Sequence, residues 1–165
     1  MSYQIRPLPV DVLRQLRLRD DAGREPVPVV DEDGGNPLRC CFGRTKPHEE
    51  VLLVSYAPLR RWGGERGVDV GAYDEVGPIF IHARDCGGPV GDGFPVDMLG
   101  RRRVLRAYDA DGHIRCGRFL ESVEDIGTAR VESELAELYA DPEVAAVHLR
   151  AVEFGCFLLE TSRAD

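Results

Sequence analysis

The sequence predicts an α+β fold: one domain over residues 1–165, with a mostly antiparallel sheet and two helices packed on it. The length of 165 residues suits a single buried core, and 43% hydrophobic with 30% charged residues is typical of globular proteins. Short apolar runs that favour strands alternate with loops rich in the 18 glycines and 11 prolines. Apolar residues recur at helical spacing in two segments, which gives the two helices.

The N-terminal half predicts one helix, which starts at Pro9 and ends near Asp20. A long loop follows over residues 22–37, and a Gly-rich loop begins at Trp62. The segment 51–57 is apolar on both faces, which predicts a strand in the centre of its sheet. The other strands expected in this half cover residues 3–6, 38–42 and 79–83.

The C-terminal half predicts a hairpin, the second helix and two closing strands. The hairpin strands, 104–109 and 113–120, flank an Asp-Gly dipeptide that favours a two-residue turn. In that register the core face of the hairpin consists of Leu105, Ala107, Ile114 and Cys116. The helix covers residues 125–140 and ends at Asp141-Pro142. The closing strands are expected at 144–150 and 156–162.

Composition and charge argue against several classes of partner. The net charge of −8 disfavours a nucleic acid and an anionic membrane surface, because both require a basic patch. No apolar run is long enough to span a bilayer, and the first residues lack the features of a signal peptide. Five cysteines without framework spacing predict free thiols in the cytoplasm. A small anionic ligand and a homodimer remain as the expected partners.

The histidines and cysteines form the most informative pattern. One apolar run ends in His82 and Cys86, and a second delivers His148 and then Cys156. Reactive groups are often presented at strand ends, so these four residues are the candidate catalytic residues. If the last two strands pair with Arg150 opposite Cys156, His148 and Cys156 share a face; if Ala151 lies opposite Cys156, they do not. The sequence leaves both registers open.

Arg150 is the first candidate for ligand binding, because strict alternation places it on the same strand face as His148. Glu75 and Tyr73 are the other ligand-binding candidates, and both precede the strand that carries His82. The alternative role for Arg150 is a surface salt bridge with a glutamate, either Glu153 or Glu160.

The sequence assigns no metal ligand and no cofactor. Zinc sites use about four nitrogen and sulfur ligands, commonly delivered as close pairs, and the nearest pair here is His82-x-x-x-Cys86. Cys40 and Cys41 would point to opposite faces of the strand expected over 38–42, so they are not expected to reach one ion together. Signatures of phosphate-binding loops, hydrolase elbows and dinucleotide sites are missing from the sequence.

A set of short runs extends from about residue 37 to about residue 160: Pro37–Cys41, Glu50–Pro58, Tyr73–Ala83, Leu105–Gly112, Val147–Ala151 and Gly155–Phe157. Together these runs resemble the bacterial domain-of-unknown-function 1203 family. The resemblance implies a small bacterial protein whose motifs gather around His82 and around His148 with Cys156. It implies no activity, cofactor or substrate.

Three functions therefore stay open, and whether the protein is an enzyme is left undecided. The leading hypothesis is a cytoplasmic ligand-binding or accessory protein, in which both His–Cys pairs and Arg150 line one pocket. The second is a cysteine- or metal-dependent enzyme that acts on a small anionic substrate. The third is a structural protein that self-associates and has no site.

Overall fold

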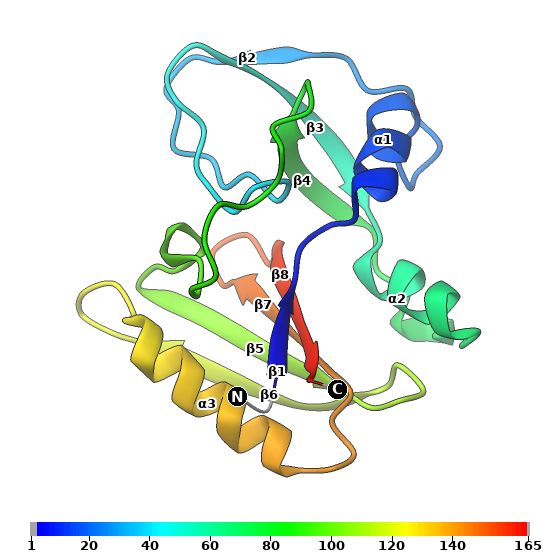
Figure 1. The fold of residues 1–165 in the computed structure, drawn as a ribbon, viewed down its shortest axis with the longest axis vertical. Coiled ribbons are helices and arrows are strands. Elements are labelled where there is room, and N and C mark those ends of the chain that lie inside the picture. The colour runs from blue at the N-terminus through cyan, green and yellow to red at the C-terminus, as the bar shows by residue number, and fades with distance from the viewer. Residues whose placement is uncertain (1–2, 165) are drawn as a thin grey trace. The chain divides into compact units, whose positions relative to one another are not determined.

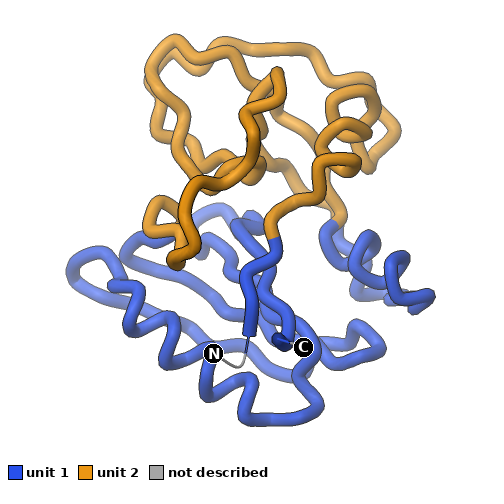
Figure 2. Tube along the Cα trace, viewed as in Figure 1, with its two compact units in different colours: residues 1–6, 58–75, 99–165 blue, residues 7–57, 76–98 orange. Residues whose placement is uncertain are grey.

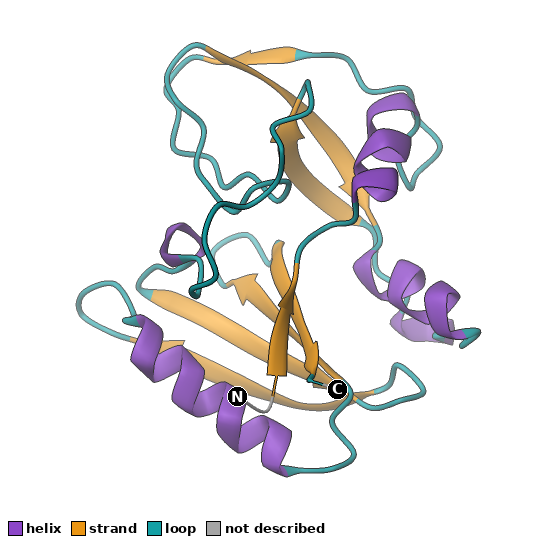
Figure 3. Cartoon of the chain, viewed as in Figure 1, coloured by secondary structure: helices purple, strands orange, loops and turns teal. Residues whose placement is uncertain are grey.

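The fold is described from a computed structural model, which covers residues 3–164. The internal contacts of the chain divide it into two compact units (Figure 2). Unit 1 comprises residues 3–6, 58–75 and 99–164, and unit 2 comprises residues 7–57 and 76–98. Strands and helices are both present throughout, so the α+β class is confirmed (Figure 3). The expectation of a single domain stays a prediction.

Unit 2 contains a three-stranded antiparallel sheet in the order β2-β3-β4, formed by β2 (Val29–Asp31), β3 (Glu49–Tyr56) and β4 (Gly77–His82). Helix α1 (Val10–Leu18) lies against β3 and buries the apolar face that the sequence predicts, which consists of Val12, Leu13 and Leu16. The position of β3 between its two neighbours confirms the expected central strand. A 3-10 turn at Val96–Met98 closes the unit.

Unit 1 contains a five-stranded antiparallel sheet in the order β1-β8-β7-β5-β6. The strands are β1 (Tyr3–Arg6), β5 (Arg102–Tyr108), β6 (Ile114–Glu121), β7 (Ala146–Ala151) and β8 (Phe157–Arg163). Helix α3 (Thr128–Ala140) crosses one face of this sheet (Figure 1). Its Tyr139 stacks on Tyr3 and hydrogen-bonds with Thr161 of β8. The expected helix and closing strands are therefore confirmed, with small shifts at their ends.

A third helix, α2 (Pro58–Arg66), replaces the Gly-rich loop that the sequence predicts from Trp62, and a 3-10 turn at Gly71–Tyr73 follows it. Proline suits a first helical position, and Leu59 and Trp62 pack with Tyr108 in a buried cluster. A Cβ on Gly63 would lie 2.6 Å from the carbonyl oxygen of Val68. Gly63 therefore permits close packing of α2 against the segment that follows it. Because the structure has three helices and two sheets, the expected arrangement of two helices on a single sheet is wrong.

The hairpin β5–β6 has a longer turn than the sequence predicts. The N–H of Asp109 donates to the carbonyl of His113, and a β-bulge shifts the register beyond it. Leu105 and Ala107 are buried as expected. Ile114 and Cys116 are exposed, because β6 is the edge strand of the sheet, so their assignment to the core is wrong.

Within residues 3–164, no helix is both long enough and apolar enough to cross a membrane.

Candidate functional site

A turn over residues 37–43 lies beside β4, where the sequence predicts a short strand. The N–H of Leu38 donates to the carbonyl of Gly43 (2.8 Å) and closes the turn. Leu38 also forms an isolated parallel bridge with Phe80 of β4, which holds the turn against that strand. Two adjacent cysteines lie in this turn, so their side chains are not restricted to opposite faces of a strand.

Four side chains of unit 2 meet at the end of β4: Cys40, Cys41, His82 and Cys86. Their three sulfur atoms and one imidazole nitrogen all lie within 4.8 Å of one another. Nδ1 of His82 is 3.3 Å from Sγ of Cys40 and 3.8 Å from Sγ of Cys41. Cys40 is fully buried, whereas Cys86 is exposed. The cluster therefore extends from the core of the unit to its surface.

Glu49 of β3 sets the orientation of the His82 ring. Its Oε1 lies 3.0 Å from Nε2 of His82, and both side chains are only 22–26% exposed. An ionised carboxylate only accepts hydrogen bonds, so Nε2 donates to Glu49 and Nδ1 is the ring nitrogen that faces the sulfur atoms. Metal-binding histidines are commonly held by a carboxylate in this way.

The two adjacent thiols ionise unequally, because Cys40 donates a hydrogen bond to the sulfur of Cys41. This bond lowers the pKa of Cys41 to about 6 and raises the pKa of Cys40. Backbone N–H groups also point at the sulfurs: Gly43 at Cys41, and His82 at Cys40 with a distance of 3.2 Å. The surroundings of Cys41 therefore favour its thiolate form over that of Cys40.

An arginine fixes the chain beside the cluster, and charged side chains of both signs surround the entrance to it. Arg17 of α1 donates to the carbonyl oxygens of His82 (3.2 Å) and Arg84 (2.9 Å), which fixes the chain as it leaves β4. A cavity of about 360 Å³ opens at this point, lined by Glu50, His82, Ala83, Arg84, Asp85 and Cys86. The lining carries two carboxylates and one guanidinium, and the guanidinium of Arg17 adjoins it at the Arg84 carbonyl, so the charges at this entrance are balanced.

The sequence identifies half of this cluster. His82 and Cys86 are expected as reactive residues, whereas Cys40 and Cys41 are set aside because a strand is expected at 38–42. That expectation is wrong, since these residues form a turn. The signal for the turn is present in the sequence: the cysteines stand between Pro37 and Gly43, and both residue types interrupt strands.

The two predicted His–Cys pairs belong to different units: His82 and Cys86 to unit 2, His148 and Cys156 to unit 1. In unit 1 the N–H of Ala151 donates to the carbonyl of Cys156 (2.9 Å). This is the register for which the sequence predicts that His148 and Cys156 point to opposite faces. Within residues 3–164 no hydrogen bond joins these two side chains.

The structure places His148 in the interior of unit 1, with no exposed surface. Its Nε2 lies 3.1 Å from a carboxylate oxygen of Glu160, and its ring contacts the rings of Tyr108 (4.7 Å) and Phe157 (5.1 Å). Its Nδ1 is buried without a hydrogen-bond partner among residues 3–164. The thiol of Cys156 donates to a backbone carbonyl two residues earlier (3.6 Å).

Two of the expected ligand-binding residues pair with each other. Arg150 lies 3.1 Å from the carboxylate of Glu75, which also accepts two hydrogen bonds from Arg106 (2.9 and 3.0 Å). Arg150 thus forms a salt bridge, with neither of the two glutamates expected, and its role in ligand binding stays a prediction. The third candidate, Tyr73, packs its ring near the His113 ring (5.4 Å).

Comparison with known proteins gives one match. A family model described as a protein of unknown function, DUF1203, matches residues 35–163. The matched range contains all four residues of the cluster in unit 2 and nearly coincides with the region that resembles this family in the sequence. No curated protein and no solved structure matches the chain.

Proposed function

The chain belongs to the DUF1203 family, and we propose that it binds a zinc-class divalent ion through Cys40, Cys41, His82 and Cys86. The observation that carries the proposal is the convergence of these four ligand atoms within 4.8 Å. Three sulfurs and one imidazole nitrogen form one of the common ligand sets of structural zinc sites. The proposal develops the metal part of the second hypothesis from the sequence, a cysteine- or metal-dependent enzyme.

The distances within the cluster support tetrahedral coordination. Zinc binds sulfur at about 2.3 Å and imidazole nitrogen at about 2.0–2.1 Å, so a tetrahedral site separates the nitrogen from each sulfur by about 3.6 Å. The two separations from Nδ1 of His82, 3.3 Å to Cys40 and 3.8 Å to Cys41, bracket that value. The sulfur–sulfur separations lie within 4.8 Å, against about 3.8 Å in a tetrahedral site, so an ion fits after the side chains draw together by about 1 Å at most.

The protonation of the cluster also supports an ion. Metal binding requires thiolates and a neutral imidazole whose lone pair is free. Cys41 has a lowered pKa of about 6, and the hydrogen bond to Glu49 leaves Nδ1 of His82 as the lone-pair nitrogen. With four protein ligands the site is closed, which favours a structural or storage role over hydrolysis. Exposed Cys86 is the ligand through which the ion enters and leaves.

Cobalt substitution tests the proposal directly. Reduced full-length protein is titrated with Co²⁺, which reports tetrahedral thiolate coordination through its absorption spectrum, and then with Zn²⁺ in competition. We expect one equivalent to bind and the C41S, C86S and H82A variants to lose the spectrum. Cys116, which lies outside the cluster, provides the matched control C116S. A spectrum that persists in C41S, or the lack of any tetrahedral spectrum, contradicts the proposal.

A second candidate function rests on the same thiols. The Cys41 thiolate has two further sulfurs within 4.8 Å, an arrangement that suits reduction of a peroxide. The thiolate attacks one peroxide oxygen, and the leaving hydroxide or alkoxide takes up a proton to give water or alcohol. The resulting sulfenic acid then condenses with a neighbouring thiol to give a disulfide and one molecule of water. Mass spectrometry after peroxide treatment distinguishes the candidates: a Cys41 disulfide that forms at equal rate with and without bound zinc favours redox chemistry.

A further inference from the structure

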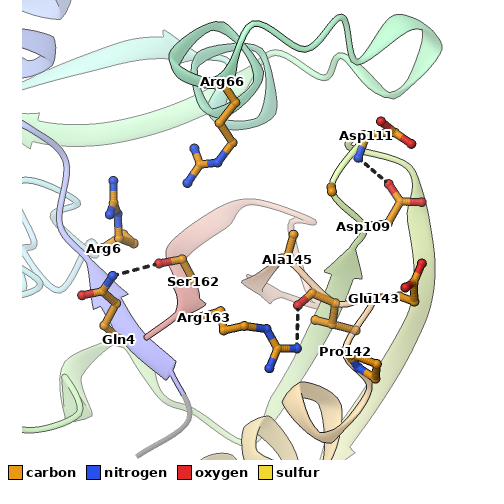
Figure 4. A pocket seen from close by; sticks show the side chains of 12 residues that line it. Gln4, Arg6, Arg66, Asp109, Asp111, Pro142, Glu143, Ala145, Ser162 and Arg163 are labelled. Carbon is orange, nitrogen blue, oxygen red and sulfur yellow. Dashed lines mark hydrogen bonds between the residues drawn. The ribbon is translucent and has the colours of Figure 1, made fainter. Parts of the chain in front are cut away.

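A second cavity lies entirely within unit 1, apart from the residues of the metal proposal. Its volume is about 360 Å³, which falls within the range of small-molecule sites, about 300–1,000 Å³. Segments distant in the sequence form its walls: β1, α2, the β5–β6 turn, the 142–145 segment and the end of β8. Figure 4 shows arginine and carboxylate side chains reaching this cavity from separate segments.

Two arginines provide the cationic side of the cavity. Arg66 extends from α2 with its guanidinium 4.5 Å from the centre of the Trp62 ring, and it donates to the Trp62 carbonyl (3.1 Å). Within residues 3–164, the carboxylate of Glu65 is the ion-pair partner of both guanidiniums, at 3.7 Å from Arg6 and 3.5 Å from Arg66. These separations exceed the usual hydrogen-bond distance, so both guanidinium groups retain N–H donors for an anionic ligand.

Two carboxylates provide the anionic side, at the β5–β6 turn and after α3. Asp111 and Glu143 line the cavity, and their carboxylates make no hydrogen bond or ion pair within residues 3–164. Asp109, their neighbour, is used differently, because its Oδ1 accepts the N–H groups of Asp111 and His113 and shapes the turn. Figure 4 shows Asp111 and Glu143 on the side of the cavity away from Arg6.

A third arginine in the cavity wall has a structural role. The guanidinium of Arg163 donates to three carbonyl oxygens, those of Tyr139, Asp141 and Val144. These bonds use three of its five N–H donors and fix the segment that follows α3. The charged side chains without such a structural role are two guanidiniums on one side of the cavity, Arg6 and Arg66, and two carboxylates on the other, Asp111 and Glu143.

From this arrangement we infer that the cavity binds a small zwitterion that carries both a carboxylate and an ammonium group, of the free amino acid or short peptide class. The ligand carboxylate pairs with Arg6 and Arg66, and its ammonium group pairs with Asp111 and Glu143. A ligand with charge of one sign leaves the opposite side of the cavity uncompensated. Electrostatic complementarity therefore selects the dipolar molecule over a phosphate or a polyamine.

Calorimetric titration of the full-length protein tests this inference. The probes are the proteinogenic amino acids and glycylglycine, each compared with N-acetylated and C-amidated derivatives that lack one of the two charges. We expect at least one zwitterion to bind and each blocked derivative to bind at least about tenfold more weakly, since each loses charge-assisted hydrogen bonds. Preference for glycylglycine over the free amino acids identifies peptide termini as the ligand.

Matched variants separate the cavity from general charge effects. R6Q and D111N are expected to weaken binding at least about tenfold. Arg118 of β6 and Glu137 of α3 pair with each other and do not line the cavity. R118Q therefore changes the net charge as R6Q does, and E137Q changes it as D111N does. The inference is overturned if no zwitterion binds, if the blocked derivatives bind equally well, if inorganic phosphate or putrescine binds more tightly, or if R118Q weakens binding as much as R6Q.

Discussion

Replacing Glu49 with glutamine tests whether the carboxylate supports the proposed metal ligand His82. Its Oε1 lies 3.0 Å from Nε2, and both side chains are about three-quarters buried, so the charge acts on the ring with little screening by solvent. Glutamine can still accept the hydrogen bond but does not raise the basicity of the imidazole. Losses of such carboxylates typically weaken metal affinity about 10- to 100-fold. We expect E49Q near the lower end of this range.

Glu50, the next residue along β3, provides a control of equal charge. Its exposed carboxylate makes no hydrogen bond or ion pair within residues 3–164, and E50Q changes the net charge from −8 to −7 as E49Q does. Zinc affinity is measured by competition with a chromophoric chelator of known affinity. Glu50 lines the cavity at the entrance of the cluster but does not contact a proposed ligand, so we expect E50Q to bind zinc within about twofold of the natural protein. Equal affinities of E49Q and E50Q would refute a supporting role for Glu49.

Three further predictions concern stability and thiol reactivity. In α2, G63A should lower the free energy of unfolding by about 1–3 kcal/mol, because the added Cβ meets the Val68 carbonyl. G64A should raise the free energy of unfolding by up to about 1 kcal/mol, because its added Cβ meets no atom. Urea unfolding measures both. Burial raises the pKa of Asp20, but hydrogen bonds from three backbone N–H groups to its carboxylate outweigh burial and lower it. The contribution of Asp20 to protein stability is therefore fully present above its unfolded pKa, near 4, and is lost as the pH falls below that value. D20A should cost about 2–4 kcal/mol in urea unfolding at pH 7 and flatten that acid dependence. In metal-free protein, the rate of alkylation of Cys41 should rise with pH through a midpoint near 6, as measured by quantitative mass spectrometry. Equally fast alkylation of Cys156 at pH 7 would contradict this prediction.

Regular patterns made much of the fold predictable. The central strand β3, the helix α3 and the closing strands carry apolar residues at the spacing of their elements, and burial of those residues is what stabilises them. Helix α2 was not predictable from local propensity, because it contains Gly63 and Gly64. The first of these glycines is required by contact with Val68, and such a contact is visible only once the tertiary structure is known.

The candidate site was half predictable for a related reason. His82 and Cys86 follow a strand that its apolar run identifies, so their place at a strand end could be expected. The positions of Cys40 and Cys41 depend on a turn whose hydrogen bonds and bridge to Phe80 join segments about forty residues apart. Turn residues beside the cysteines were the only local signal, and the apolar residues between them favoured a strand.

The separation of the ligands along the chain gives the proposed ion a mechanical role as well as a chemical one. Cys40 and His82 are 42 residues apart, and the chain between them contains β3 and α2 and leads into β4. A crosslink that closes a loop of this length lowers the entropy of the unfolded chain. By the relation used for disulfides, this loss raises the free energy of the unfolded chain by about 4 kcal/mol. The sheet of unit 2 has only three strands, one of them three residues long, so its own pairing provides limited stability. A buried ion that joins the 37–43 turn to β4 supplies stability where the sheet provides least, without the oxidising conditions that a disulfide requires.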